Sequence, residues 1–241
     1  MYYLSKYLGG SHSYGLNTES SDIDYRGVFA NTDANRILGL DRFDHQDKKE
    51  GGDECYFEVR NFLNLLRRGN TQAIEALFID PKNLIIDSSE WFLILENRNS
   101  LLDTKKLFSC VMGYAQGERK LFTGERTGAL GGKRKENIDK LGFSPKNYTQ
   151  LMRLLWAATY FIQNKIFPVK IQDYNTSLHE FLFEVKTKPE NYKKEDLLTT
   201  SYVYEDRLKE VFNERNITQD FTFNPDVANE LLLGVYLKFL K

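Results

Sequence analysis

A strand-like run that ends at two glycines, followed by two aspartates before a second strand-like run, constrains this chain more than any other feature. Tyr2 to Leu8 is rich in aromatic residues and stops at Gly9-Gly10. Ile23 to Ala30 is predicted to form the next strand. Because glycine has no Cβ, the turn after the first strand can bring backbone N–H groups and the Ser11 hydroxyl close to a phosphate. The segment therefore predicts strands joined by a turn that suits an anion.

Asp22 and Asp24 flank one residue at the start of the second predicted strand. Side chains two residues apart on a strand point to the same face, so the two carboxylates are expected to converge. Neighbouring carboxylates repel each other, and a hard divalent cation relieves that repulsion. Mg²⁺ takes one or two protein carboxylates together with substrate phosphate oxygens. A Gly-Ser pair alone is typical of any turn, and two aspartates alone of solvated surface, but together they indicate phosphoryl or nucleotidyl transfer.

The pattern of secondary structure changes near Asn61. Before it, Cys55 to Val59 alternates apolar and polar residues as a half-buried strand does, and Asp33 to Asp53 is polar and predicted to be a loop or flap. After it, an apolar stripe over 62–66 begins a helical region, in which Thr71 is the predicted N-cap of a helix that contains Glu75. Further helices are predicted at 90–96, 107–121, 145–163, 178–185, 195–214 and 225–240, with a mobile linker over 123–144. The fold class is therefore α/β (α+β), a small mixed sheet followed by an α-helical domain.

Composition excludes several classes of protein. A net charge of −1 gives no overall attraction to nucleic acid, so any anion site must be local. The chain has no apolar run long enough for a membrane span, and Met1 to Leu8 lacks the pattern of a signal peptide, so a cytoplasmic protein is expected. Metal-ligand spacing is absent from its few cysteines and histidines, so no zinc site is expected and the cysteines are predicted to be small buried hydrophobes. These residues are Cys55, Cys110, His12, His45 and His179.

Gly10-Ser11 followed by Ser21-Asp22-Ile23-Asp24 resembles the motif of polymerase β-type nucleotidyltransferases, and the run GSHSYGLNTESSDIDYRGVF resembles their RNA-repair-associated branch in bacteria and phages. The resemblance continues through Phe57–Leu63, Gly69-Asn70 and Glu75–Phe78. It implies a nucleotidyltransferase core over residues 1–103 and a helical C-terminal domain over residues 104–241. The family also tends to place Lys, His, Arg and two leucines where this chain has Lys146, Gln150, Arg153, Leu154 and Leu155, so Gln150 departs from the usual His.

The resemblance implies a third catalytic and metal-binding carboxylate on the strand after the flap, and Glu58 is the predicted residue. Asp53 and Glu54, at the start of that strand, compete with it, since the register of the strand relative to Asp22 and Asp24 is unknown from sequence. An ordinary exposed strand residue is the alternative interpretation of Glu58.

Lys146, Gln150 and Arg153 share one face of the helix over 145–163, where they are predicted to bind the triphosphate; a solvated helix face is the alternative. Two other groups of basic residues each have a functional and a structural interpretation. Lys133-Arg134-Lys135 either contacts an RNA backbone or lies in a solvated loop, and Arg26 either braces the aspartates or forms a structural ion pair.

The activity implied by the resemblance is transfer of a nucleoside monophosphate from a nucleoside triphosphate, such as ATP, to an acceptor hydroxyl. Two Mg²⁺ ions, or Mn²⁺, would be bound by Asp22, Asp24 and Glu58, and Gly10 and Ser11 would hold the β- and γ-phosphates. An RNA end, especially that of a tRNA, is the expected acceptor. Two alternatives remain: a hydroxyl of a partner protein such as a toxin (AMPylation), and a non-catalytic nucleotide- or RNA-binding module.

Overall fold

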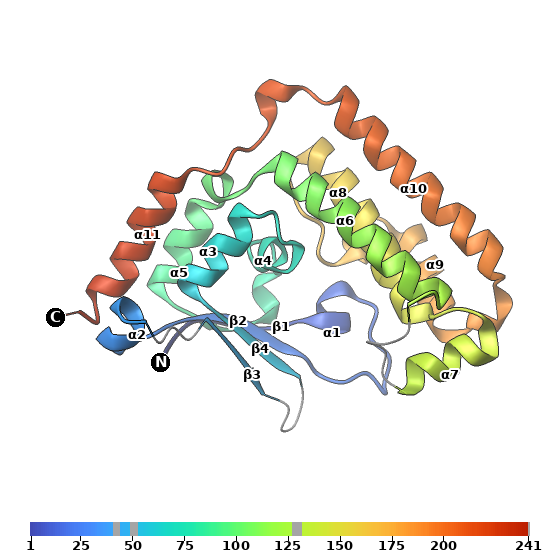
Figure 1. Ribbon diagram of the computed structural model, residues 1–241, viewed down its shortest axis with the longest axis horizontal. Helices are drawn as coiled ribbons and strands as arrows, with labels where there is room; N and C mark the ends of the chain where they lie inside the picture. The colour runs from blue at the N-terminus through green and yellow to red at the C-terminus, as the bar shows by residue number, and fades with distance from the viewer. Residues whose placement is uncertain (41–43, 49–52, 127–131, 241) are drawn as a thin grey trace. The chain divides into compact units, whose positions relative to one another are not determined.

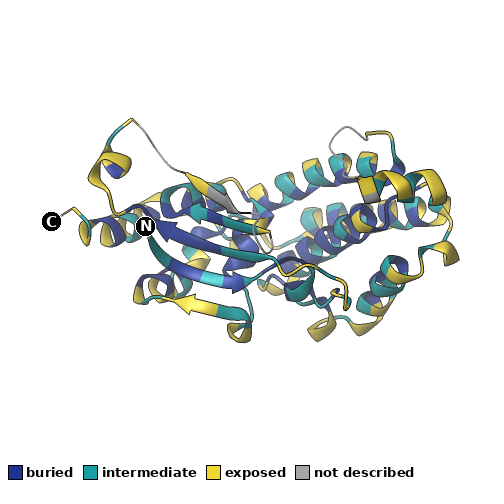
Figure 2. Cartoon of the chain, turned by 90° about the horizontal axis from the view of Figure 1, so that it is seen from below, coloured by how far each residue is buried: buried dark blue, intermediate teal, exposed yellow. Residues whose placement is uncertain are grey.

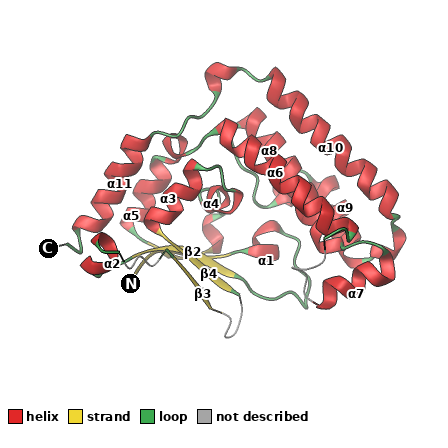
Figure 3. Cartoon of the chain, viewed as in Figure 1, coloured by secondary structure: helices red, strands yellow, loops and turns green. Residues whose placement is uncertain are grey.

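The computed structural model describes residues 1–40, 44–48, 53–126 and 132–240, with backbone alone at 46–48 and 133. The chain divides into two compact units (Figure 1). Unit 1 comprises Met1–Lys106 and Gln219–Lys241, and unit 2 comprises Leu107–Thr218. Unit 1 holds the sheet, whereas the described part of unit 2 is helical (Figure 3). The predicted fold class is confirmed, but the C-terminal segment, which the sequence placed in the helical domain, returns to the unit that contains the sheet.

Five strands of unit 1 form a mixed sheet in the order β3-β4-β2-β1-β5. In this sheet β2 and β4 run parallel, while β1–β2, β1–β5 and β3–β4 are antiparallel pairs. The first strand has its predicted bounds, β2 begins two residues later than predicted, and β4 ends one residue earlier because Val59 starts a helix. Sequence patterns did not predict β5. The bounds are β1 (Tyr2–Leu8), β2 (Tyr25–Ala30), β3 (His45–Lys48), β4 (Glu54–Glu58) and β5 (Leu84–Asp87).

Helices α3, α4, α5 and α11 gather on one side of the sheet (Figure 1). Their apolar faces and the buried strand residues form the core of unit 1, where the rings of Phe62 and Trp91 lie 5.6 Å apart and both residues are fully buried. The inner strands of the sheet are largely buried in Figure 2. The helices of unit 1 are α1 (Gly10–Tyr14), α2 (Ala34–Leu38), α3 (Val59–Arg67), α4 (Thr71–Ala76), α5 (Ser89–Glu96) and α11 (Pro225–Leu237).

The prediction of a loop over Asp33 to Asp53 was wrong in part. The segment contains α2, which Asp33 caps by accepting a hydrogen bond from the Asn35 N–H at 2.9 Å, and β3, which pairs with β4. Its residues 41–43 and 49–52 lie outside the described residues. The predicted cap of α4 was also wrong by one residue: Asn70, not Thr71, accepts a hydrogen bond from the backbone N–H of Ala73 at 3.1 Å.

Unit 2 is built around α8, whose residues Leu151, Leu154, Leu155 and Ala158 are buried. The predicted linker over 123–144 contains α7, and its residues 127–131 lie outside the described residues. A buried ion pair at 2.6 Å between Arg119 and Glu205 joins two of the helices. The helices are α6 (Thr104–Thr123), whose first residues belong to unit 1, α7 (Gly132–Leu141), α8 (Pro145–Asn164), α9 (Thr176–Thr187) and α10 (Lys194–Glu214).

The chain leaves unit 1 and re-enters it at adjacent points. The Thr104 N–H donates to the Phe221 carbonyl at 3.0 Å, and the Phe221 N–H donates to the Thr104 hydroxyl at 3.0 Å. Unit 2 is therefore an insertion in unit 1, and hydrogen bonds join the two segments of unit 1 that precede and follow it. Throughout the part of the chain that the structure describes, the helices are too short or too polar to cross a lipid bilayer.

Candidate functional site

The glycine turn after β1 lies directly against the aspartate loop. The Gly9 N–H donates a hydrogen bond to the Asp24 carbonyl at 2.8 Å. Gly10 has a φ of +58°, in the left-handed region that L side chains rarely adopt, and a Cβ placed on it would lie 1.8 Å from Asp24 Oδ2. A Cβ on Gly9 would lie 2.7 Å from Cδ of Arg26. Both glycines therefore leave room for charged side chains that come from the neighbouring segment.

Asp22 and Asp24 lie in the loop that leads into β2, because that strand begins only at Tyr25. The alternation of side chains along a strand consequently does not apply to them, and their convergence stays a prediction. A turn fixes the start of the loop: the Ser21 N–H donates to the Thr18 carbonyl at 2.9 Å, and the Thr18 N–H donates to the Ser21 hydroxyl at 2.8 Å. Asp22 is exposed and Asp24 half-buried.

The two carboxylates are available to a ligand. In the described residues, no hydrogen bond or ion pair involves either side chain, and no group of three or more His, Cys, Asp or Glu side chains is placed to hold a metal ion. A pair of carboxylates without protein partners, one of them seated over a glycine, fits Mg²⁺, which takes its remaining ligands from water and substrate.

Glu58 lies far from these aspartates, at the other end of the parallel β2–β4 pair. Tyr25 is opposite Glu54 and Phe29 is opposite Glu58, which puts Glu58 about 13 Å along the sheet from the level of Tyr25. Its carboxylate accepts hydrogen bonds from the Tyr236 hydroxyl at 2.5 Å and the Arg60 N–H at 2.8 Å. Burial raises the pKa of Glu58, although these donors oppose the rise. The structure does not bring Glu58 to Asp22 and Asp24, and its contacts are those of a buried helix cap.

The register favours Asp53 among the competing carboxylates. The Tyr25 N–H donates to the Asp53 carbonyl at 2.9 Å, so Asp53 lies beside Asp24 where the two strands begin. Glu54 instead forms an ion pair with Lys6 at 3.2 Å, and Lys6 lies over the Tyr25 ring at 4.4 Å.

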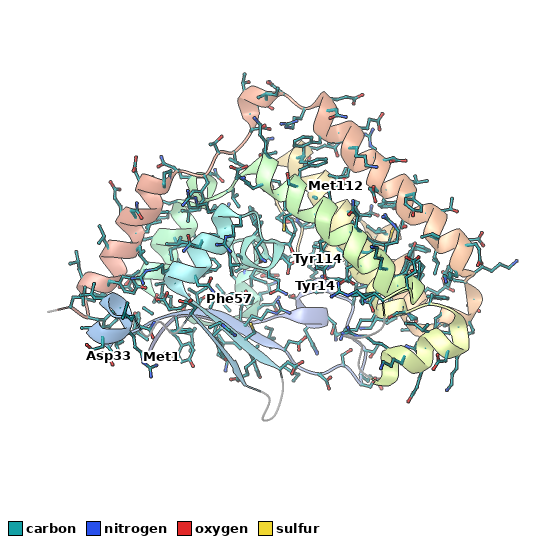
Figure 4. The ribbon with its side chains drawn as sticks, in the orientation of Figure 1. Met1, Tyr14, Asp33, Phe57, Met112 and Tyr114 are labelled. Atoms are coloured by element: carbon teal, nitrogen blue, oxygen red, sulfur yellow. The ribbon has the colours of Figure 1, made fainter. Side chains whose placement is uncertain are left out.

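Three residues, Tyr14, Arg26 and Glu75, border the site; Arg26 is half-buried and the other two are buried. Sequence analysis predicted a role at the site only for Arg26. Tyr14, at the end of α1, donates from its hydroxyl to Glu75 of α4 at 2.9 Å (Tyr14 is labelled in Figure 4). Burial lowers the pKa of Arg26, but the nearby Tyr14 and Glu75 raise it by more, so the guanidinium is firmly charged. Tyr14 lies in the motif run, whereas Glu75 was predicted only as part of a helix, because the sequence does not show that Tyr14 is its partner.

The three residues predicted to bind the triphosphate lie on α8 in unit 2 and differ in exposure. Lys146 is exposed and Gln150 half-buried, whereas Arg153 is 1% exposed. Gln150 Oε1 accepts hydrogen bonds from Nε and Nη2 of Arg153, at 3.2 and 3.1 Å. Gln150, which replaces the family's usual His, thus holds the buried guanidinium within unit 2. A contact of these residues with nucleotide stays a prediction.

The basic run over residues 133–135, within the predicted linker, belongs to α7 and is therefore helical, not a loop. Arg134 is half-buried and Lys135 is exposed on α7, whereas the Lys133 side chain lies outside the described part of the chain. Its contact with RNA stays a prediction.

The mixed sheet thus carries a glycine turn that packs against the loop of Asp22 and Asp24. The model of the RNA repair pathway DNA polymerase beta family (RlaP) matches residues 4–214, and the chain belongs to this family. No curated protein matches the chain.

Proposed function

We propose that the protein is a Mg²⁺-dependent enzyme that transfers a nucleoside monophosphate from a nucleoside triphosphate to a hydroxyl at an RNA end. The close approach of Asp24 to the glycine turn is the observation that carries the proposal, because it brings a cation ligand and a phosphate-binding turn within a few ångströms. Membership of an RNA repair family supports the choice of an RNA acceptor.

Each residue of the proposed site has a role that follows from its chemistry. Asp22 and Asp24 would hold the metal, while the Gly10 backbone and the Ser11 hydroxyl would bind the β- and γ-phosphates. Asp53, which replaces Glu58 in the proposal, would hold the acceptor hydroxyl and accept its proton. When bound, Mg²⁺ would neutralise the phosphates and polarise the acceptor hydroxyl.

The distribution of charge between the units also supports an RNA acceptor. Unit 1 has 15 Lys and Arg against 20 Asp and Glu, whereas unit 2 has 18 against 14. The near-neutral chain thus contains an acidic unit with the proposed metal site and a basic unit. Basic surface is what an RNA backbone requires, and a protein acceptor does not need it.

The test is incubation of the purified chain with each α-labelled nucleoside triphosphate, Mg²⁺ and total tRNA, followed by denaturing gels. We expect label on RNA, and loss of that label in Asp22→Ala/Asp24→Ala. The matched control is Asp87→Ala/Asp226→Ala, which removes two exposed aspartates elsewhere in unit 1 and should leave transfer intact. Label on protein would replace the RNA acceptor with a protein. Absence of label, or full turnover by the Asp22/Asp24 variant with its fold intact by circular dichroism, would remove the proposed reaction.

A further inference from the structure

The outer side of α5 and α11 carries large apolar side chains that the core of unit 1 does not bury. Phe92 and Leu93 of α5 are 50% and 51% exposed, and Leu233 and Leu237 of α11 are 58% and 59% exposed. We call these four residues the α5–α11 face, since the two helices pack against each other. An exposed apolar patch with polar residues around it is typical of an interaction surface.

A groove runs between the two helices within this face. It has a volume of about 260 Å³, and its lining includes Leu93 of α5 and Leu231, Gly234 and Val235 of α11. A Cβ on Gly234 would meet no atom within 4 Å, so the groove is open where this glycine lies. Because glycine has no side chain, the backbone of another helix can approach α11 closely at this point.

The charges of α11 are arranged symmetrically about Gly234. Glu230 precedes the glycine by four residues and Lys238 follows it by four, so both lie about one helical turn from it along the same side of the helix. If a second copy of α11 ran antiparallel and crossed at Gly234, each Glu230 would lie at the level of Lys238 of the other copy. Within the described part of the chain the Glu230 carboxylate has no hydrogen bond or ion pair, and the Lys238 side chain is 49% exposed although it pairs with Glu90.

The apolar residues of α11 follow the same symmetry. Leu231 and Leu237 are each three residues from Gly234, so in an antiparallel copy Leu237 of one chain would lie at the level of Leu231 of the other. A two-fold contact uses the same surface twice, and it therefore requires a surface that is complementary to itself. The arrangement about Gly234 meets this requirement for both charge and apolar packing.

We propose that the protein forms a two-fold symmetric dimer in which the α5–α11 face of one copy covers that of the other, with the two α11 helices antiparallel and crossing at Gly234. A second copy is the occupant, because an acid and a base at equal distances from one glycine match a second α11. A stable interface buries about 800 Å² of each partner, with an apolar centre and a polar rim. The α5–α11 face supplies the centre, while Glu230 and Lys238 supply the rim.

The first experiment measures the molar mass of the full chain by light scattering after size exclusion, over a series of concentrations. We expect twice the mass of one chain, and the mass of one chain in Leu233→Glu/Leu237→Glu, where carboxylates would be buried in the interface. The matched control is Val203→Glu/Ile217→Glu, which changes residues of unit 2 that are 61% and 65% exposed and should stay dimeric. A monomeric original chain at every concentration, a dimeric Leu233→Glu/Leu237→Glu, or equal loss of the dimer in both variants would overturn the proposal.

Gly234→Cys tests the crossing point without relying on a disrupted interface. A residue on the two-fold axis faces its own copy, so a short bismaleimide should link two chains through this position. In Asn229→Cys, also exposed on α11, the two residues would lie about 15 Å apart along the helix axis and should not be linked. Cys55 and Cys110 are present in both variants and contribute equally. Equal linking of the two variants, or none in Gly234→Cys, would refute the antiparallel crossing.

Glu230→Lys tests the charge pairing. Lysines would then meet twice across the axis, and we expect the dissociation constant of the dimer to rise at least about tenfold. Glu214→Lys makes the same charge change on an exposed residue of unit 2 and should leave the constant unchanged. An equal rise in both variants would remove the charge argument for a second copy. The dimer is independent of the proposed reaction, so nucleotide transfer by a strictly monomeric chain would remove the dimer alone.

Discussion

At the scale of single residues, Gly10 and Asp24 occupy one small volume that no larger residue pair could share. Gly10 has the left-handed φ of +58°, and the position of a Cβ on it is already filled by Asp24 Oδ2, 1.8 Å away. A side chain at position 10 would therefore displace the carboxylate as well as strain the backbone.

Gly10→Ala is accordingly expected to abolish nucleotide transfer and Mn²⁺ binding, and to destabilise the chain by about 1–3 kcal/mol. Gly113→Ala is the control, since a Cβ on this exposed residue of α6 meets no atom within 4 Å. Replacing a glycine by alanine inside a helix stabilises the folded state by about 0.5–1 kcal/mol, so Gly113→Ala should not destabilise the chain. Thermal unfolding and Mn²⁺ titration of both variants check the prediction, and intact Mn²⁺ binding in Gly10→Ala would contradict it.

Spacing along the chain was sufficient to select Gly10, Asp22 and Asp24, because local sequence determines a turn and the loop that packs on it. It was insufficient for the third carboxylate. Asp53, Glu54 and Glu58 all belong to one strand segment, and only its pairing with β2 shows that Asp53 lies beside Asp24. The Tyr14–Glu75 contact likewise joins residues from separate elements, which no periodicity reveals.

At the scale of elements, α11 is attached to the sheet unit by polar contacts at two points. Tyr236 donates to Glu58, and the Arg60 guanidinium lies over the Tyr236 ring at 5.1 Å. Lys238 pairs with Glu90, which also accepts the Tyr2 hydroxyl. Each attachment thus combines a glutamate, a tyrosine and a cation, as the group around Glu75 does.

The Glu90 attachment predicts how stability depends on pH. Burial alone would raise the pKa of Glu90, but Lys238, a backbone N–H and Tyr2 outweigh it and lower the pKa to about 2. The unfolded chain takes up the proton near its ordinary value of 4.5, whereas the folded chain resists until about 2. The stabilisation is therefore present above pH 4.5 and disappears as pH falls toward 2.

Glu90→Gln should melt at a lower temperature than the original chain at about pH 6, and the difference should shrink as the pH is lowered through about 4 toward 2. Thermal unfolding followed by circular dichroism across this range checks it. Asp103→Asn, a change to a partly exposed helix cap in the same unit, is a useful comparison because no cation is paired with that residue in the described structure. A Glu90→Gln difference that grows on acidification would contradict the assignment.

Helical periodicity predicted α5, α6, α8, α9, α10 and α11 to within a few residues at each end, because long amphipathic runs carry their own signal. The short elements were missed for a common reason. β3 and β5 exist through their pairing with β4 and β1, and α7 lies in a polar, lysine-rich stretch without a long apolar stripe. The secondary structure of such segments is determined by tertiary contacts, not by local sequence patterns.

At the scale of the whole molecule, the division of charge between the units predicts how RNA binding depends on salt. Unit 2 carries the excess of basic residues, and three of them, Arg134, Lys135 and Lys140, lie on α7. If they neutralise phosphates of the RNA, replacing them reduces the number of counterions released on binding as well as the affinity.

Arg134→Glu/Lys135→Glu/Lys140→Glu is expected to weaken RNA binding, and to lower the salt slope by about 0.7 for each single-strand phosphate that the variant no longer neutralises. The control, Lys82→Glu/Lys105→Glu/Lys106→Glu, makes the same charge change on exposed residues of unit 1. Fluorescence anisotropy of labelled RNA at several salt concentrations measures the affinity and its salt slope for each variant. Equal weakening by the two variants would show that net charge alone matters, and that α7 has no special part.

The return of residues 219–241 to unit 1 has a consequence for the order in which the protein matures on the ribosome. Unit 2 is one continuous stretch, so it can fold as soon as it has left the exit tunnel. The strands of the sheet are synthesised earlier, yet Glu58 gains its hydrogen bond from Tyr236, and Glu90 its ion pair with Lys238, only when the last residues of unit 1 have been made. Unit 1, whose first part is made before unit 2, is thus completed only after unit 2 has been synthesised.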